Sequence, residues 1–422
     1  MSDTKFTFFK QSGWMVFATV AGGIFMFAVH KAAGKMDKTE YGVFLTLLQV
    51  LNLMAIPSIG LQTIVMRQTV AALSETQRRE LNRAIRTLLA GTFFLWLFIG
   101  ALAFGFQQVL IERWKISNPA ALHITIFWGL GAFWLPIFTA LLQGRQNFLW
   151  MGGVGIAGGL VRLIAVSVIV LLLGGQAAGA AFGVLIALVL PAGLAAWHSR
   201  DIWLGPGEAV PWRDWLRHVL PLTLGPGAVT FMMSQDMLIV QSAFPEQETA
   251  YYGAAGMIGR ALVFLTAPLT AVMFPKIVNA AARAQKSDAM LLALGATALL
   301  GVGAALACTV FPSLPLRIVY DASFLKISWL VPWFAWCMLP LTLGTVLVNN
   351  LVAREQYQAV PWIVAVAAGY GVALRYFHAS FLQVVQVLGI FGLMLIAVCL
   401  WFTLRGRQQS PPQPVALTQP AD

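Results

Sequence analysis

Long apolar runs alternate with short polar breaks along almost the whole chain. Each run holds about 20 residues or more, the length that a helix needs to cross a bilayer. A short polar stretch precedes the first run without a cleavage site, so we expect an uncleaved first span. The pattern predicts twelve spans, at residues 12–30, 42–66, 87–111, 124–143, 148–174, 177–197, 216–243, 251–274, 289–311, 327–350, 358–377 and 380–404.

The composition agrees with a membrane protein and excludes several other classes. Of the 422 residues, 59% are hydrophobic and 10% charged, whereas soluble domains carry about 25% charged residues. A soluble enzyme, a nucleic-acid binder and a disordered scaffold are therefore excluded. We expect an all-α integral membrane protein of about 12 transmembrane helices, surrounded by membrane lipid and without a nucleic-acid partner.

The basic residues predict which way the helices cross. The net charge of +11 fits cytoplasmic loops enriched in Lys and Arg, as the positive-inside rule requires. With the N-terminus inside, 17 Lys and Arg residues lie in cytoplasmic segments and eight outside. Both termini are thus predicted to be cytoplasmic. The Pro- and Gln-rich residues 406–422 are predicted to form a disordered tail.

The longest predicted internal loops, residues 67–86 and 198–215, are both cytoplasmic. The first contains Ser74-Glu75-Thr76-Gln77, a capping-box pattern in which side chain and backbone at a helix start bond each other. It predicts a short interfacial helix within that loop.

A weak internal repeat divides the chain into two halves. A shift of 211 residues lays Tyr41-Gly42 on Tyr252-Gly253 and Pro57 on Pro268, and a shift of 209 lays Leu142–Phe148 on Leu351–Tyr357. Six spans per half make the halves parallel, as in transporters built from repeats. We expect two parallel-related six-helix bundles around a central cavity, at residues 1–205 and 206–405.

Four short motifs carry a family resemblance. The run Lys38–Phe44 followed by Pro57–Leu61 resembles the first hairpin of polysaccharide flippases, and Leu142–Phe148 resembles the end of their fourth span. Residues Ser234–Val240 and Ala250–Ala255 are similar to their seventh and eighth helices. These flippases belong to the multidrug/oligosaccharidyl-lipid/polysaccharide exporter superfamily, and the resemblance covers about residues 10–405.

The resemblance implies a flippase of the bacterial inner membrane. Its cargo would be an undecaprenyl-pyrophosphate-linked oligosaccharide, coupled to H⁺ or Na⁺, with polysaccharide polymerases as candidate partners. Two alternatives stay open. One is a drug/cation antiporter of the multidrug and toxic compound extrusion type, and the other is a membrane-embedded polysaccharide polymerase or ligase. The predicted outer loops are too short for the large loop that such enzymes use.

Three charged side chains fall deep within predicted spans, where each costs at least about 2.5 kcal/mol and is by default a functional candidate. They are Arg162, Asp236 and Arg260. Asp236 lies roughly 10 Å from the outer end of its helix and Arg260 roughly 13 Å from that of the next. The two are therefore predicted to pair, either architecturally or as an ion-coupling carboxylate that releases Arg260 to a phosphate.

Arg162 has no acidic partner within a span. We expect it to line a cavity and to bind pyrophosphate, because guanidinium donates in a two-pronged fork. Two Arg against one Asp favour an anionic cargo over a cationic drug.

Polar residues of the second span are weaker candidates. At the 211-residue shift Gln49 corresponds to Arg260, and Asn52 follows on the same face. Both are predicted either to line the cavity or to be amides bonded to a neighbouring helix. The five histidines lie near helix ends without metal-binding spacing, and we expect them to be interfacial or solvated. No ATP-binding motif or cofactor site is predicted.

Overall fold

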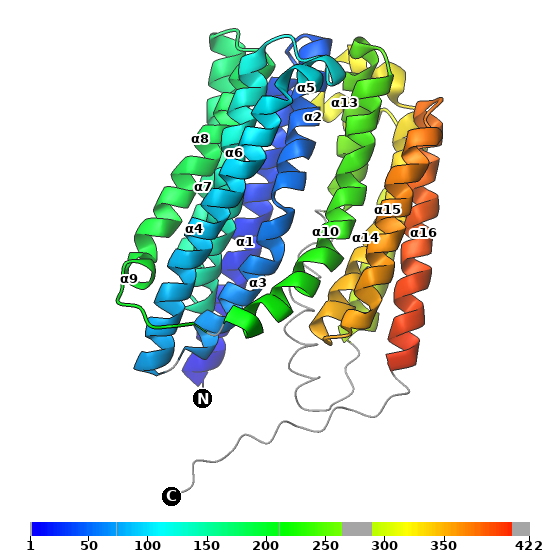
Figure 1. Ribbon diagram of the computed structural model, residues 1–422. Coiled ribbons are helices and arrows are strands. Elements are labelled where there is room, and N and C mark those ends of the chain that lie inside the picture. The colour runs from blue at the N-terminus through cyan, green and yellow to red at the C-terminus, as the bar shows by residue number, and fades with distance from the viewer. Residues whose placement is uncertain (1, 73, 211, 264–288, 407–422) are drawn as a thin grey trace, which may run out of the picture.

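The computed structural model describes residues 2–72, 74–210, 212–263 and 289–406. Helices run side by side along one direction (Figure 1), because only a helix satisfies its own backbone hydrogen bonds inside a bilayer. The first half consists of α1 (Ser2–Ala33), α2 (Lys38–Met54), α3 (Ile56–Ala71), α4 (Glu75–Gly105), α5 (Gln107–Arg113), α6 (Pro119–Gly144), α7 (Phe148–Ser167) with a π turn (Val168–Leu172), α8 (Ala177–His198) and α9 (Arg200–Trp203).

The second half begins with α10 (Trp212–Ala243) and a helix at residues 246–263. It continues with α12 (Ala289–Val310), α13 (Leu314–Val319), the 3₁₀ turn η2 (Ala322–Ile327), α14 (Leu330–Ala353), the 3₁₀ turn η3 (Tyr357–Ala359), α15 (Val360–Tyr376) and α16 (Phe381–Gly406). Gly406, the first residue of the predicted disordered tail, ends α16. The rest of that tail and residues 264–274 of the predicted span 251–274 lie outside the described residues.

Two ends of the molecule are used below. The start of α1 and the end of α16 lie at one end, here called the termini end, and α5 and α13 lie at the other, here called the distal end (Figure 1). Basic residues predicted to be inside, such as Arg145 and Arg354, follow helices that finish at the termini end. Which end faces the cytoplasm stays a prediction.

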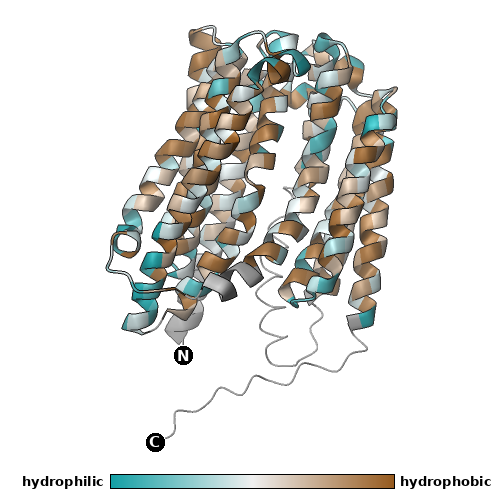
Figure 2. Cartoon of the chain, viewed as in Figure 1, coloured by the Kyte–Doolittle hydropathy of each residue, from teal (hydrophilic) through white to brown (hydrophobic). Residues whose placement is uncertain are grey.

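The surface between the ends is apolar. Brown, hydrophobic residues follow the helices along their length, and hydrophilic ones gather toward the ends (Figure 2). Large side chains such as Leu172 and Leu299, each 76% exposed, point outward. Among the described residues, nine helices are long and apolar enough to cross a membrane, or ten when α2 and α3 count as one bent span.

The predicted span 42–66 is not one straight helix. α2 and α3 meet at Ala55 with a bend of 43°. Pro57 occupies the first turn of α3, where the missing N–H and the ring restrict the preceding residue and favour a new helix start. A single apolar run therefore hides a break.

The prediction of a separate interfacial helix in 67–86 is wrong. Ser74 and Gln77 do form the capping box: the Gln77 N–H donates to Ser74 Oγ at 3.2 Å and the Ser74 N–H to Gln77 Oε1 at 3.1 Å. The helix that it caps is α4 itself, with 31 residues. Such a helix is about 46 Å long, so its polar first turns project beyond a bilayer core of about 30 Å.

The repeat has a structural counterpart at the ends of α6 and α14. After Gly144 the amides of residues 145, 146 and 147 bond the carbonyls of 141, 143 and 142, and after Ala353 those of 354, 355 and 356 bond 350, 352 and 351. Gln146 and Glu355 both have positive φ, 56° and 57°. α6 packs on α4 and α8 as α14 packs on α12 and α16. The same cap at a 209-residue shift supports two related halves.

Close packing of α7 on α1 depends on glycines in both helices. A Cβ atom at Gly159 would lie 2.7 Å from the Gly22 carbonyl oxygen, and one at Gly22 would lie 3.1 Å from that of Gly155. Small residues thus let the two backbones approach, which fixes the face of α7 that α1 covers.

Candidate functional site

Asp236 and Arg260 form a buried ion pair in the second half. Arg260 Nη2 donates to both carboxylate oxygens of Asp236, at 2.6 and 2.7 Å, and its Nε donates to the Met233 carbonyl at 2.9 Å. Tyr252 donates its hydroxyl to Asp236 Oδ2 at 2.7 Å. Asp236 is fully buried and Arg260 is 4% exposed. Arg260 Nη2 and the Tyr252 hydroxyl thus converge on one carboxylate, while Arg260 Nε is satisfied by a backbone carbonyl.

The turn at residues 244–245 makes this pair possible. Pro245 stops α10 because proline cannot continue the hydrogen-bond ladder, so α10 and the helix 246–263 become neighbours. That helix starts five residues earlier than predicted, and Arg260 lies about 21 Å along it rather than 13 Å. The pairing still forms, because helical side chains lean toward the N-terminus of their helix, here back toward the turn and Asp236.

Aromatic rings enclose the pair. The Arg260 guanidinium lies 6.0 Å from the centroid of Phe334, and the Tyr252 ring packs on Phe334 at 5.0 Å and on Phe381 at 5.3 Å. Tyr370 is fully buried, and its hydroxyl has no hydrogen-bond partner among the described residues. Removing either charge would leave the other stranded in this apolar shell.

Arg162 has a very different environment, between α7 and α1. Its Nη1 lies 3.3 Å from the Met26 sulfur, a weak acceptor. Its Nε is buried without a hydrogen-bond partner, and no carboxylate pairs with it in the described part of the chain. It follows Gly159 by three residues, so the close helix contact brings it against α1.

One turn after Met26 on α1, a polar chain links the two halves. His30 Nδ1 lies 3.0 Å from the Tyr41 hydroxyl, which lies 2.9 Å from the hydroxyl of Tyr320 in the second half. His30 is only 3% exposed, so the prediction that every histidine is interfacial or solvated is wrong. The Tyr41 hydroxyl supplies a hydrogen bond that solvent would otherwise make, and Tyr320 in turn bonds Tyr41.

Gln49 and Asn52 on α2 bond each other, with Asn52 Nδ2 donating to Gln49 Oε1 at 3.1 Å. Gln49 is 4% exposed and Asn52 is exposed. The structure therefore brings together two of the predicted sets, Asp236 with Arg260 and Gln49 with Asn52. Among the described residues, Arg162 bonds to neither set.

The sequence reasoning missed Tyr252, although a signal was present. Tyr252 precedes Arg260 by eight residues, hence on the same helical face, and it is the repeat mate of Tyr41. Tyr252 bonds Asp236 within its own half, whereas Tyr41 bonds His30 in its own half and Tyr320 in the other. The adjacent Gly42 packs beside Ala250, so the Tyr-Gly repeat marks where the halves meet.

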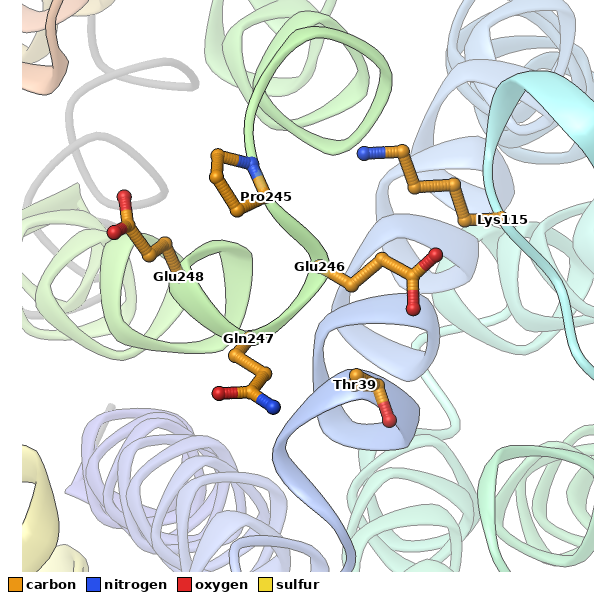
Figure 3. Close-up of a pocket in the computed structure, with 6 residues that line it drawn as sticks. All are labelled: Thr39, Lys115, Pro245, Glu246, Gln247 and Glu248. Carbon is orange, nitrogen blue, oxygen red and sulfur yellow. The ribbon is translucent and has the colours of Figure 1, made fainter.

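A cavity of about 490 Å³ lies at the distal end, away from both arginines. Its lining includes Thr39, Lys115 and the residues 245–248 (Figure 3). Lys115 Nζ donates to the Phe244 carbonyl at 2.5 Å. The Glu248 side chain points away from Lys115 (Figure 3). Among the described residues, no group of three or more His, Cys, Asp or Glu side chains could hold a metal ion.

Comparison with known proteins identifies the fold. No family profile matches the chain, and neither does any curated protein. Among solved structures, a multidrug resistance MATE family transporter of the MOP superfamily, inward-facing, is similar with a TM-score of 0.69 and 14% identity over 93% of this chain and 95% of that one. The lipid II flippase MurJ, in an inward closed conformation, gives 0.72 and 13% over 93% and 87%. The chain has the MOP-superfamily fold.

A third MOP transporter, from Pyrococcus furiosus and described by the reverse polarity of its binding pocket, gives a TM-score of 0.56 with 14% identity over 94% of this chain and 92% of that one. The fold confirms the predicted class of an all-helical membrane protein with about twelve spans in two bundles. These MOP neighbours are transporters and flippases rather than enzymes. The boundary between residues 205 and 206 stays a prediction.

Proposed function

We propose that this MOP-fold protein flips an undecaprenyl-pyrophosphate-linked oligosaccharide, an O-antigen, capsule or exopolysaccharide unit, from the inner to the outer leaflet of a bacterial inner membrane. The two bundles, residues 1–205 and 206–405, would alternate access to a site between them. The fold supports a transporter, and similarity to the lipid II flippase MurJ supports a lipid-linked cargo.

The observation that carries the proposal is the unsatisfied guanidinium of Arg162. A cation in the membrane without a carboxylate is costly, and its buried Nε has no hydrogen-bond partner. A pyrophosphate offers several oxygen acceptors to a planar fork of donors. In this proposal the cargo completes the bonding that the protein leaves open at Arg162.

The Asp236–Arg260 pair is proposed as the coupling element. Protonation of the Asp236 carboxylate, or Na⁺ binding to it, would neutralise the partner of Arg260 and free that guanidinium for a phosphate. Gln49 and Asn52 would add polar contacts along the cargo path. The pair therefore links ion binding to cargo binding without any resident cofactor.

A reconstituted flipping assay tests the Arg162 proposal. The purified chain is placed in vesicles with a fluorescent undecaprenyl-pyrophosphate oligosaccharide, and leaflet exposure is followed with a membrane-impermeant quencher. We expect Arg162→Ala to lose flipping and Arg162→Lys to retain part of it. Arg375→Ala, at the distal end, is the control and keeps the wild-type rate. Full flipping by Arg162→Ala would refute the proposal.

The coupling proposal needs a variant that still folds. Asp236→Asn combined with Arg260→Gln removes both charges together while keeping amide hydrogen bonds. We expect it to lose dependence of flipping on an imposed H⁺ or Na⁺ gradient. If the double variant is present at the same amount of folded protein and its flipping still depends on the gradient, the pair has only an architectural role.

A drug/cation antiporter is the second candidate, favoured by the similarity to MATE transporters and by the carboxylate of Asp236. The same vesicles, loaded with a fluorescent organic cation, distinguish the two. Gradient-driven cation export with no flipping of the lipid-linked sugar would select the antiporter. The polymerase or ligase alternative lacks such support, because the solved neighbours are transporters.

A further inference from the structure

A second cavity, of about 200 Å³, lies at the distal end between the C-terminal end of α1 and the C-terminal end of α13, each with the two residues that follow it. From the first half it is lined by Lys31, Gly34 and Lys35, and from the second by Arg317–Asp321. A water occupies about 30 Å³ in the liquid, so the cavity holds a group the size of a phosphate.

Cations dominate this cavity. Lys35 pairs with Asp321 at 2.8 Å, whereas Lys31 and Arg317 are exposed and have no hydrogen bond or ion pair within the described residues. Three cations against one carboxylate leave a net charge of +2. Two more cations lie nearby, Lys38 over the Phe324 ring and Lys326 over the Tyr251 ring, each 3.7 Å from the centroid.

This concentration of charge runs against the distribution that orients the helices. Of the eight Lys and Arg residues predicted to be outside, five lie within residues 31–38 and 317–326. Basic residues outside work against the positive-inside rule, so their gathering at one point needs a local reason. An anion bound there would supply it.

The flanks of the cavity show where that anion comes from. Phe311, Leu314 and Ile318 are 59%, 51% and 65% exposed around α13, an apolar surface suited to acyl chains. Cations beside such a surface lie at headgroup depth, where each Lys or Arg gains about 1 kcal/mol from anionic lipid. We propose that this cavity binds the phosphate of an anionic phospholipid in the adjoining leaflet, with Arg317 and Lys31 as the main donors.

The site is complete only where the two halves meet. A Cβ atom at Gly34 would lie 3.1 Å from the Tyr320 ring, so glycine permits the close approach of α1 to the second half. A headgroup held by Lys31 on one side and Arg317 on the other therefore stabilises contact between the halves at the distal end. The inference does not depend on the cargo, because it concerns a resident lipid.

Lipid retention tests the site directly. The detergent-purified chain is mixed with phosphatidylglycerol, and bound lipid is counted by native mass spectrometry over a concentration series. We expect Lys31→Gln with Arg317→Gln to weaken binding about 30-fold, about fivefold for each cation. The matched control Arg375→Gln, also an exposed cation at the distal end, keeps wild-type binding. Equal retention in all three proteins overturns the proposal.

A gain-of-binding variant excludes misfolding as the explanation. Asp321→Asn removes the only carboxylate lining this cavity and frees Lys35, so binding should tighten about fivefold. A weakened or unchanged affinity counts against the site. Inorganic phosphate and phosphatidylcholine are the remaining probes: neither should compete with phosphatidylglycerol at equal concentration. Competition by inorganic phosphate at the lipid's own affinity would overturn the assignment to a lipid headgroup.

Discussion

Two arginines deep in the membrane, one in each half, have opposite surroundings. Arg260 donates to a carboxylate and to a carbonyl, and a tyrosine completes the carboxylate's bonds. Arg162 touches a methionine sulfur, and its Nε is left without a partner. The difference lies in the partner that the neighbouring helix offers, which is Asp236 on α10 for Arg260 but Met26 on α1 for Arg162.

The comparison indicates which of the two arginines contributes to the stability of the folded state. A buried pair contributes little beyond an apolar substitute but is costly to break, because one charge is then stranded. Arg260 is therefore tied to the stability of the second half, whatever further role it has. Arg162 has only the weak Met26 sulfur as a bonded partner, and this is why we propose that it binds a ligand.

The largest expected effect comes from breaking the satisfied pair. Asp236→Asn should lower the free energy of unfolding by about 3–5 kcal/mol, because Arg260 stays buried without a counterion. Asp321→Asn, the same change in an exposed pair, should cost less than about 1 kcal/mol. Thermal unfolding in detergent compares them, and equal losses would remove the distinction between buried and exposed pairs.

Replacing both partners should restore stability. Asp236→Leu with Arg260→Met removes both charges and fills the apolar shell around Phe334, so the double variant should approach the wild-type unfolding temperature. If the double variant is no more stable than Asp236→Asn alone, the hydrogen bonds of Tyr252 and the Met233 carbonyl, rather than the stranded charge, account for the loss of stability.

At Arg162 the opposite result is expected. Arg162→Leu should leave stability unchanged or raise it by about 1–3 kcal/mol, because insertion of an arginine at a helix centre costs about 2.5–3.5 kcal/mol. The same variant should lose flipping of lipid-linked sugar. Unfolding and flipping measured on one preparation check this, and destabilisation as large as that of Asp236→Asn would contradict it.

The glycines that bring α7 against α1 give a smaller effect. Gly159→Ala places a methyl 2.7 Å from the Gly22 carbonyl and should cost about 1–3 kcal/mol by overpacking. Gly155→Ala meets nothing within 4 Å and should be neutral or slightly stabilising, by up to about 1 kcal/mol. Unfolding temperatures of the two single variants separate these cases, and an equal cost would argue against close packing at Gly159.

The smallest effect concerns an arginine pair outside the membrane. Arg145 Nη1 donates to Asp201 Oδ1 at 2.9 Å and Nη2 donates to Oδ2, and these bonds hold the pKa of Asp201 below its usual value. A carboxyl group whose pKa is lowered by folding stabilises the folded state at pH values above its unfolded pKa of about 3.9. This stabilisation is lost as the pH falls through the lowered pKa of the folded state. Asp201→Asn should thus cost less than about 1 kcal/mol at neutral pH, and nothing at the acid end of a pH series.

Several features of this structure were predictable from the sequence. Apolar runs located most of the spans, because a bilayer imposes one length on every helix. The capping box at Ser74 and the shared motif around Arg145 and Arg354 were visible because local backbone geometry depends on nearby residues. The pairing of Asp236 with Arg260 could be predicted because the two residues lie at similar depths on helices that follow each other along the chain.

What escaped prediction depends on contacts between distant segments or on helices that leave the membrane. A hydropathy pattern does not reveal that the polar first turns of α4 belong to the same helix as the apolar span that follows them. The bonds of His30 through Tyr41 to Tyr320 join residues almost 300 positions apart. The bend at Ala55 was not predicted because the apolar run continues through it, although Pro57 in the sequence was a possible signal of a break.

The unpartnered Arg162 also has an electrical consequence. Of the three charged side chains predicted to lie deep within spans, Asp236 and Arg260 cancel, so these three carry a net +1. At an effective dielectric constant of about 20, a unit charge about 10 Å away gains or loses about 1.7 kcal/mol. An anion is thereby favoured over an equally placed cation by roughly 250-fold. If Arg162 lines the cargo path as proposed, this one side chain would select the sign of the cargo's charge before its shape matters.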